Sequence, residues 1–221
     1  LEFAAREGFG FIPLRGERDE EFQLGAGTVL KGFDIQSDYF HTRIANFFDH
    51  NALGASNIFF PLTIEHAFIR GLEATVRSPK LAGRLLLSFV YSHQRAEGQG
   101  AVTGGLTDFE PPEGGRFFLD HDQRDTFNAN FQADLPSKSY LSGGLRYGSG
   151  FLDGEGPDHL PDHATLDLAL TKKLGESWSF SVQAVNIFNH RFLVDNSNTF
   201  GGTHFSEPRQ IYIQISHRFH F

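Results

Sequence analysis

The sequence predicts an all-β protein whose strands form an antiparallel up-and-down sheet, part of the wall of a transmembrane β-barrel. Three observations support this fold class: apolar and polar residues alternate along most of the chain, the alternating segments are long, and the connections between them are short and long in turn. Successive side chains of a strand point to opposite faces, so this alternation gives each strand one apolar and one polar face.

We expect about nine strands, most of them about 10 to 14 residues long. A tilted transmembrane strand needs about 9–11 residues, whereas strands of soluble proteins usually have about 5–6, so these lengths favour a membrane barrel. In chain order the expected strands cover residues 21–30, 33–44, 65–77, 84–94, 126–135, 140–151, 163–174, 178–184 and 209–221.

The two faces of these strands predict the two environments of a barrel wall. Apolar side chains would face lipid, and polar side chains would face the lumen. Segment 126–135 places Phe and Ala residues opposite Asn and Gln residues, and segment 163–174 alternates Leu with polar residues. The side chains that we expect in the lumen include Asn128, Asn130, Gln132 and Asp167.

Two segments depart from this pattern. The apolar phase of 65–77 also places Arg70 on the lipid side, where an arginine at mid-bilayer would cost about 2–4 kcal/mol and much less near the interface. We therefore expect Arg70 near the outer rim, or above the membrane part of its strand. Segment 84–94 is apolar on both faces, so we expect its inner face to pack against another part of the protein in the lumen.

The connections predict an orientation and a location in the outer membrane. Barrels of the outer membrane have short periplasmic turns and longer extracellular loops. If the chain ends on the periplasmic side, every short connection falls there and every long one falls outside. The short connections are 31–32, 78–83, 136–139 and 174–177, and the long ones are 46–63, 95–120, 152–161 and 191–208.

Composition excludes several other classes. The net charge of −8 argues against a non-specific nucleic-acid binder, and the absence of Cys excludes disulfides, a cysteine zinc site and a thiol nucleophile. No stretch approaches 18 consecutive apolar residues, so we expect no transmembrane helix. The sequence contains no Met and begins without a signal-like segment. Nine strands are also an odd number, whereas bacterial single-chain barrels have an even number. We therefore expect a fragment of a longer precursor.

Motifs near the C-terminus resemble those of one family. Asn186, Ile187 and Phe188 end one expected strand, Pro208 and Arg209 open the last one, and that strand ends in an aromatic residue. In this order they resemble the C-terminal end of TonB-dependent outer-membrane receptors. The segments GERDEEFQLGAGTVL, DIQSDYFHTRIANFF and IRGLEATV resemble earlier strands of the same family, so the resemblance spans roughly residues 15–221.

The resemblance implies a barrel of 22 strands that encloses an N-terminal plug domain. Residues 1–221 would be the C-terminal part of that barrel, with the plug and the TonB box outside this sequence. It further implies uptake of a scarce nutrient, such as a ferric siderophore, cobalamin or an oligosaccharide, driven by the TonB complex. The implied partners are the plug, the TonB complex, membrane lipid, the barrel-assembly machinery and a small-molecule substrate, which residues in 46–63, 95–120 and 191–208 would help to bind.

The last strand carries the clearest candidate site. The resemblance implies that its alternating apolar side chains form a signal for the barrel-assembly machinery, which would pair with this edge strand. These side chains are Ile211, Ile213, Ile215, Phe219 and Phe221. The alternative is that Phe221 is simply the last lipid-facing residue.

Aromatic side chains also predict belts at the two membrane interfaces. The residues expected at the periplasmic end are Trp178, Phe180, Phe219 and Phe221. Those expected at the outer end are Phe47, Phe48, Phe59, Phe60 and Phe192, for which packing within the loops is the alternative.

Other chemical groups predict no catalytic, cofactor or metal site. The pairs His121-Asp122 and His159 with His163 lack the helical context of a metal motif, so we interpret them as solvated loop residues. Neither Ser92-His93 nor His204 with Ser206 forms a recognisable nucleophile-and-base arrangement. Three alternatives to the receptor stay open: a passive porin-like barrel, a surface enzyme or adhesin barrel, and a soluble β-sandwich.

Overall fold

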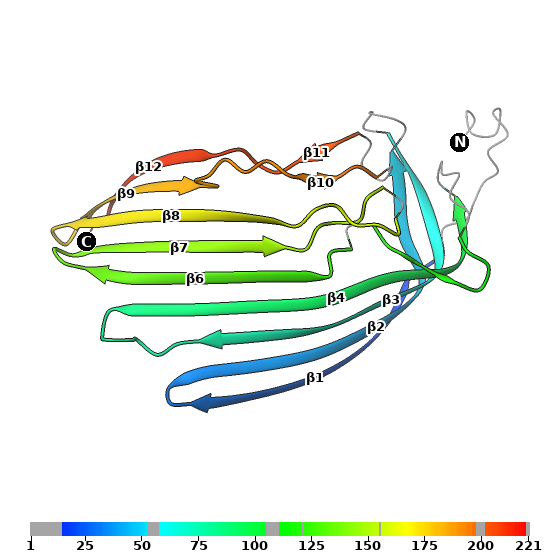
Figure 1. The fold of residues 1–221 in the computed structure, drawn as a ribbon, viewed down its shortest axis with the longest axis horizontal. Coiled ribbons are helices and arrows are strands. Elements are labelled where there is room, and N and C mark those ends of the chain that lie inside the picture. Colours follow the sequence, from blue (N-terminus) through cyan, green and yellow to red (C-terminus); the bar gives the residue numbers. More distant parts are fainter. Residues whose placement is uncertain are drawn as a thin grey trace.

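The computed structural model describes residues 15–52, 58–104, 111–120, 122–154, 156–197 and 202–219. These residues form one large antiparallel sheet of ten strands and a small hairpin. Nine strands of the large sheet follow one another in the order β1-β2-β3-β4-β6-β7-β8-β9-β12, so that the neighbours along the chain lie side by side (Figure 1). The prediction of an all-β, up-and-down sheet of about nine strands is confirmed, and the sheet of this chain is open, with β1 and β12 at its edges.

The strands of the main sheet are long. They are β1 (Arg18–Leu30), β2 (Phe33–Ala52), β3 (Phe59–Arg77), β4 (Leu85–Gly104), β6 (Asp125–Leu135), β7 (Ser139–Gly148), β8 (His163–Leu174), β9 (Trp178–Val185) and β12 (Gln210–His217). A short strand, β5 (Arg116–Phe118), pairs with β4, and β10 (Leu193–Asp195) pairs with β11 (His204–Phe205). Among the described residues we find no helix with the length and apolar character needed to cross a membrane.

Tight turns join the strands at one end of the sheet, on the left of Figure 1. Lys31 and Gly32 connect β1 to β2, and both have positive φ, at 49° and 85°. Two central residues with positive φ make a type I′ turn, whose twist matches the strands on either side. Ser137 and Lys138 adopt the same left-handed region between β6 and β7. The short connections predicted at this end are therefore present.

The long connections at the other end contain more strand than we expected. Residues 46–63 and 95–120 were predicted as loops, but β2, β3 and β4 have 20, 19 and 20 residues and extend far into both ranges. The extension is stabilised by a cluster of buried apolar residues, against which Phe47 and Ile69 pack in part. The buried members are Ile44, Leu62, Ile64, Ala67 and Leu119.

The sequence pattern hid this extension because the alternation changes phase there. Asn46 has a φ of 56°, and Ile44 and Phe47 on either side of it both pack in the cluster although they are three residues apart. The register between β3 and β4 also shifts between Ile64 and His66. A bulge of this kind moves every later side chain to the other face, so a period of two is lost.

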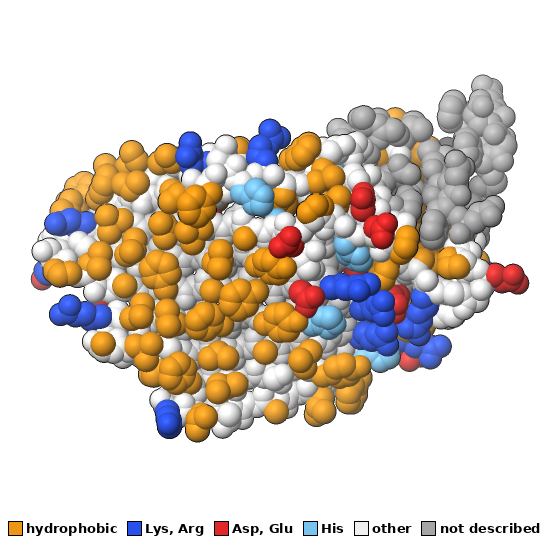
Figure 2. Space-filling model, in the orientation of Figure 1, with side chains coloured by type: hydrophobic (Ala, Val, Ile, Leu, Met, Phe, Trp, Pro, Cys, Tyr) orange, Lys and Arg blue, Asp and Glu red, His pale blue; other side chains and the backbone are white. Residues whose placement is uncertain are grey.

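We call the two faces of the sheet outer and inner. The outer face is apolar, and its side chains lie opposite one another from strand to strand, as Phe89 does to Ala129 and Ala129 to Leu145. Figure 2 shows these hydrophobic side chains as a broad field over the sheet. Several are highly exposed, such as Leu24 at 65% and Ile213 at 69%. A large exposed apolar surface marks contact with a membrane or with another protein.

Glycines make room for aromatic rings at three places in the sheet. Phe131 lies opposite Gly143, Phe40 opposite Gly71 and Phe117 opposite Gly98. A Cβ on Gly143 would lie 2.6 Å from Phe131 Cε1, so a larger residue there would clash with the ring. Cross-strand pairs of glycine and an aromatic ring therefore pack parts of this sheet.

Candidate functional site

Polar side chains form a row across the inner face of the sheet. Direct cross-strand partners run from Asp34 to Arg77, then to Ser88 and Asn130, and through Gly144 to Asp167. The row thus crosses β2, β3, β4, β6, β7 and β8. Arg77 Nη1 lies 3.7 Å from Asp34 Oδ2, which gives the row a charged pair at one end. The inner face is therefore polar where the outer face is apolar.

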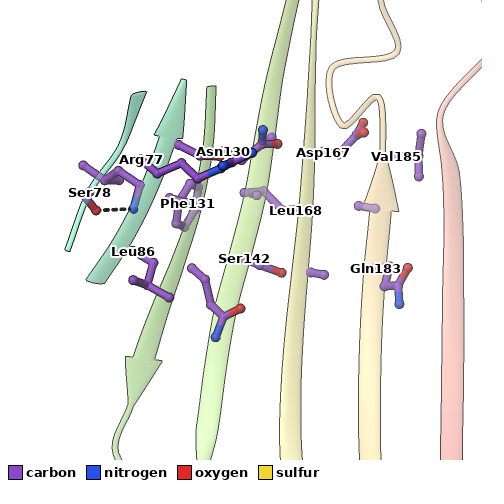
Figure 3. Close-up of a pocket in the computed structure, with 17 residues that line it drawn as sticks. Arg77, Ser78, Leu86, Asn130, Phe131, Ser142, Asp167, Leu168, Gln183 and Val185 are labelled. Atoms are coloured by element: carbon purple, nitrogen blue, oxygen red, sulfur yellow. Dashed lines mark hydrogen bonds between the residues drawn. The ribbon is translucent and has the colours of Figure 1, made fainter. Parts of the chain in front are cut away.

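A hollow of about 690 Å³ lies along this row. Its lining includes amides, hydroxyl groups, the guanidinium of Arg77 and the carboxylate of Asp167, and Figure 3 shows Arg77 extending toward Asn130. A Cβ on Gly144 would lie 2.7 Å from Asn130 Oδ1, so the glycine keeps that part of the hollow open. These groups offer both donors and acceptors, which suits contact with a polar protein surface or a polar solute.

The predicted lumen residues all belong to this inner face. Asn130, Gln132 and Asp167 line the first hollow, and Asn128 lines a second hollow of about 580 Å³ beside it. Leu86 of β4 also lines the first hollow, while Phe89 lies on the outer face. The two-sided apolar character of β4 thus places a leucine at the wall of a polar hollow, and its packing against another part of the protein stays a prediction.

The second hollow contains an aromatic stack. The ring of His163 stacks on Phe192 at a centroid distance of 3.7 Å and on Phe151 at 5.6 Å. The prediction that His163 is solvated was wrong, since its ring lies between two aromatic rings. Its place in a strand agrees with the predicted segment 163–174, since it is the first residue of β8. Phe192 likewise packs inside rather than in an aromatic belt. Arg146, Asn186, Gln210 and Tyr212 also line this hollow.

His159 is also a packed residue rather than a solvated one. Its Nε2 lies 3.0 Å from Asp122 Oδ2, and its ring meets Phe118 edge-on at 5.3 Å. Asp122 in turn accepts a hydrogen bond from the backbone of Ala96 at 2.9 Å. Within the described ranges no group of three or more His, Cys, Asp or Glu side chains could hold a metal ion, and His121 lies outside those ranges.

Asn186 organises the end of β9. It has a φ of 47° and only 2% of its surface is exposed. Its side-chain Nδ2 donates to the carbonyl oxygens of His190 at 2.9 Å and Glu207 at 3.0 Å, and its Oδ1 accepts from the backbone of His190 at 3.0 Å. One side chain therefore closes the turn after β9 and fastens it to the segment that leads into β12.

The same residue is tied to the inner wall. The backbone N–H of Asn186 donates to Asp167 Oδ1 at 2.8 Å, and Arg146 Nη2 lies 2.7 Å from Asp167 Oδ2. Asn189, whose φ is 53°, accepts a hydrogen bond from the backbone of Arg209 at 2.9 Å. Both asparagines occupy the left-handed region, which this residue type tolerates better than most.

The structure thus brings together motif residues from the two sides of the connection between β9 and β12. Asn186, Pro208 and Arg209 lie in one turn assembly, whereas Phe188 is 76% exposed. Sequence analysis missed the contributions of Asn189 and Glu207. The two asparagines of the segment NIFN were a usable signal, because asparagine is enriched where φ is positive.

The last strand, β12, which we call the closing strand, presents the predicted alternation. Ile211, Ile213 and Ile215 are highly exposed on the outer face and lie opposite Ala184, Val182 and Phe180. In the described part of the chain, β12 has one neighbour in the sheet, β9. Phe221 lies outside the described residues. A role of this strand in assembly stays a prediction.

An aromatic ladder continues the closing strand toward the turn end of the sheet. The ring of Trp178 lies 4.3 Å from His217, and His217 meets Phe219 edge-on at 4.4 Å. His217 was the one polar residue on the apolar phase of this strand. Its place between two aromatic rings explains why it interrupts the pattern without disturbing the face.

The serine and histidine pairs do not form catalytic arrangements in this structure. Ser92 and His93 are consecutive strand residues and point to opposite faces, and His93 Nδ1 lies 2.9 Å from Asp125 Oδ1. Ser206 instead supports the backbone, since its Oγ accepts from the N–H of Phe192 at 3.1 Å. These contacts are structural.

Comparisons with known proteins agree with this architecture. A family model described as TonB dependent receptor-like, beta-barrel, matches residues 10–189. Among solved structures, the ferric-catecholate import receptor Fiu from K12 E. coli is 15% identical, with a TM-score of 0.66 over 93% of this chain and 28% of that chain. The ferric enterobactin receptor PfeA from Pseudomonas aeruginosa, as a G324V mutant, is 18% identical, with a TM-score of 0.66 over 93% of this chain and 32% of that one.

A third solved structure, the copper transporter OprC, is 10% identical, with a TM-score of 0.69 over 94% of this chain and 32% of that chain. At such identities the likeness is one of fold. The chain spans about a third or less of the length of these three proteins. No curated protein matches the sequence.

Proposed function

Because the chain belongs to the β-barrel family of TonB-dependent receptors, we propose that it forms part of the wall of an outer-membrane receptor that imports a scarce nutrient. The observation that carries this proposal is the division of one continuous sheet of nine successive strands into an apolar outer face and a polar inner face. Such a division suits a wall with lipid on one side and a water-filled or protein-filled lumen on the other.

The orientation follows from the ends of the strands. The tight turns would lie in the periplasm, and the extended parts of β2, β3 and β4 would rise from the membrane on the outside. In this arrangement Trp178 and Phe219 lie at the periplasmic interface, where aromatic side chains are favoured. Residues 1–221 would be the C-terminal part of the barrel.

The inner face would contact a plug domain of the same full-length protein. Its row from Asp34 to Asp167 offers charges, amides and hydroxyl groups that can pair with a polar protein surface. The substrate would be captured outside by the extended strands and the connections above them. Siderophore, cobalamin and oligosaccharide are the classes we propose, with transport driven by the TonB complex.

Uptake by cells that carry the full-length receptor tests this function. Radiolabelled ferric siderophores, cobalamin and oligosaccharides would be supplied to a strain that lacks other receptors, with and without a functional TonB complex. We expect uptake of one class that stops when TonB is removed. Flux that continues without TonB would favour a passive porin-like barrel, and a purified full-length protein that hydrolyses lipid or peptide without any uptake would favour a surface enzyme.

A further inference from the structure

The second hollow lies at the end of the inner face that is opposite the tight turns. Its walls come from early residues of β6 and β8, from the last residues of β7, and from the connection between β9 and β12. Figure 1 shows this connection, with β10 and β11, beyond the end of β9. The volume of about 580 Å³ is within the range of about 300–1,000 Å³ of sites that bind small molecules.

A buried amide in this hollow has a free hydrogen-bond donor. Gln123 lines the hollow and is 7% exposed, and its side-chain Nε2 has no hydrogen-bond partner among the residues that the structure describes. Gly148 leaves room for this group, since a Cβ there would lie 2.7 Å from His163 Nε2 and closer still to Gln123 Nε2. A buried donor without a partner is unfavourable, so a ligand that brings an acceptor would complete the site.

Other polar groups of the hollow can both donate and accept hydrogen bonds. Asn128 contributes an amide, and Thr126 and Thr165 contribute hydroxyl groups. Each hydroxyl group of a sugar also donates and accepts, so these side chains can pair with several neighbouring hydroxyl groups of one ligand. The polar lining therefore suits a polyhydroxylated ligand.

The charged groups of the hollow favour an uncharged ligand. Among the described Asp, Glu, Lys and Arg side chains, those of Arg146 and Glu207 line it. Arg146 Nη2 also lies 2.7 Å from Asp167 Oδ2, so its charge is already paired. An anionic ligand would meet the carboxylates of Glu207 and Asp167, and a cationic ligand would meet Arg146. Charges of both signs in one site thus disfavour a strongly charged ligand of either sign.

Tyr212 provides an accessible aromatic ring. It lies on the inner face and is 49% exposed, and its hydroxyl group donates to Gln210, which restrains the ring. The face of an aromatic ring carries partial negative charge, which attracts the C–H groups on one face of a sugar ring. The stacked rings of Phe151, His163 and Phe192 cover one another instead, so they form a rigid wall of the hollow.

We propose that the second hollow binds part of an uncharged oligosaccharide, with the Gln123 amide as a donor to the sugar and the Tyr212 ring stacked on it. The amide and hydroxyl groups pair with the sugar hydroxyl groups, and the tyrosine contacts the apolar face of the ring. A charged metal complex would need unpaired charges of the opposite sign in the site. This inference rests on the proposed uptake function and assigns one of its substrate classes to a site in the wall.

Binding by the full-length receptor, purified in detergent, tests the ligand class. The receptor is applied to an array of uncharged oligosaccharides and of their counterparts that contain uronic acids. Ferric enterobactin and cyanocobalamin are titrated separately by calorimetry. We expect binding to uncharged oligosaccharides, and about 10-fold weaker binding when a uronic acid replaces a sugar, because its carboxylate would meet Glu207.

Two variants test the site itself. Gln123→Leu removes the amide, and Tyr212→Ala removes the ring at an exposed position where the fold is least affected. Each should weaken binding of the best uncharged oligosaccharide about 10-fold, and the two together about 100-fold. Gln36→Leu and Tyr140→Ala make the same changes on the inner face away from this hollow and should bind as the wild type does.

Three results would overturn the inference: no uncharged oligosaccharide binds, the acidic oligosaccharides bind more tightly, or the site variants bind no more weakly than the controls. Uptake by cells separates this inference from the proposed function. If ferric enterobactin or cyanocobalamin binds instead, and its uptake depends on TonB, this inference alone fails. If the bound oligosaccharide enters cells equally with and without TonB, the site stands and the proposed TonB-driven import fails.

Discussion

The side-chain Nδ2 of Asn186 donates a hydrogen bond of 3.0 Å to the carbonyl oxygen of Glu207, which joins the end of β9 to the start of β12. The two residues are 21 positions apart in the sequence. This contact, with two more from the same side chain to His190, makes Asn186 the anchor of the closing strand.

Replacement of Asn186 by Ala should destabilise the folded receptor by about 2–4 kcal/mol. The change leaves buried backbone groups without hydrogen-bond partners, and it forces an alanine to adopt a positive φ, which is unfavourable for a residue with a Cβ. Asn186→Gly removes the same hydrogen bonds, but glycine adopts a positive φ without strain. Its loss of folding stability should therefore be smaller by about 1 kcal/mol. Urea unfolding of the full-length protein in detergent measures both. Two variants of equal stability would show that φ plays no part, and an unchanged Ala variant would contradict the anchoring role.

Gly143→Ala should destabilise the sheet by about 1–3 kcal/mol, as overpacked sites do. The new Cβ would lie 2.6 Å from Phe131 Cε1, 2.7 Å from Leu168 Cδ2 and 2.9 Å from the Asp167 carbonyl oxygen. Gly27→Ala is the matched control in another strand, since its Cβ would have its nearest neighbours at 3.4 Å. The same unfolding assay should separate them, and equal losses would argue against the tight pairing of Gly143 with Phe131.

Two neighbouring residues of β7 test the assignment of the faces. The chain contains no Cys, so Ser142→Cys and Leu141→Cys each introduce one new thiol into it. A water-soluble maleimide should label the Ser142→Cys variant, whose thiol points inward, only when the lumen is accessible. It should fail to label the Leu141→Cys variant in a membrane. When the receptor is truncated to its barrel, the Ser142→Cys variant should be labelled more strongly than in the full-length receptor, because the lumen is then accessible. Rapid labelling of the Leu141→Cys variant in vesicles would contradict the lipid-facing assignment.

Trp178, the sole tryptophan of the chain, should lie at a membrane interface. In the full-length receptor, with any other tryptophans replaced by Phe, lipids brominated close to the headgroup should quench its emission more than lipids brominated near the chain ends. Stronger quenching from the chain ends would place the turn end of the sheet deep in the bilayer and contradict the orientation.

Ile213→Asp should reduce the amount of folded receptor in the outer membrane, because a charge on the lipid face opposes both insertion and the proposed assembly signal. Gln214→Asp places the same charge one residue away on the inner face and should have little effect. Heat-modifiable mobility of the receptor in membrane fractions gives the folded amount. Equal losses in the two variants would mean that the face of the closing strand is unimportant.

The sequence predicts the membrane part of this fold well, because lipid and lumen impose opposite demands on alternate residues. From Phe127 to Leu135, for example, outward apolar positions follow one another without a change of phase. That Arg70 lies at the outer rim stays a prediction, and its side chain contacts Glu97. The alternation could not indicate Glu97 as the partner, because Glu97 is 27 residues away and lies beyond the predicted end of its strand at residue 94.

Beyond the apolar field of the outer face, the alternation of apolar and polar residues becomes less informative. Asn46 has a positive φ and the register shifts after Ile64, so buried residues there are not two apart, and β2 and β4 were predicted too short. Local chemistry still gave a signal at Asn186, but the identity of its partner depends on how a long connection returns to the sheet. The path of such a connection is determined by tertiary packing and not by the periodicity of the sequence.

The edges of the open sheet have a consequence for the order of folding. In the part of the chain that the structure describes, β1 pairs with β2 alone and β12 with β9 alone, so each has there a line of backbone donors and acceptors without a neighbouring strand. In hydrocarbon each such group costs several kcal/mol, so an open sheet would not be tolerated there. In the proposed outer-membrane receptor, insertion into the bilayer must therefore be coupled to the pairing of β1 and β12 with further strands.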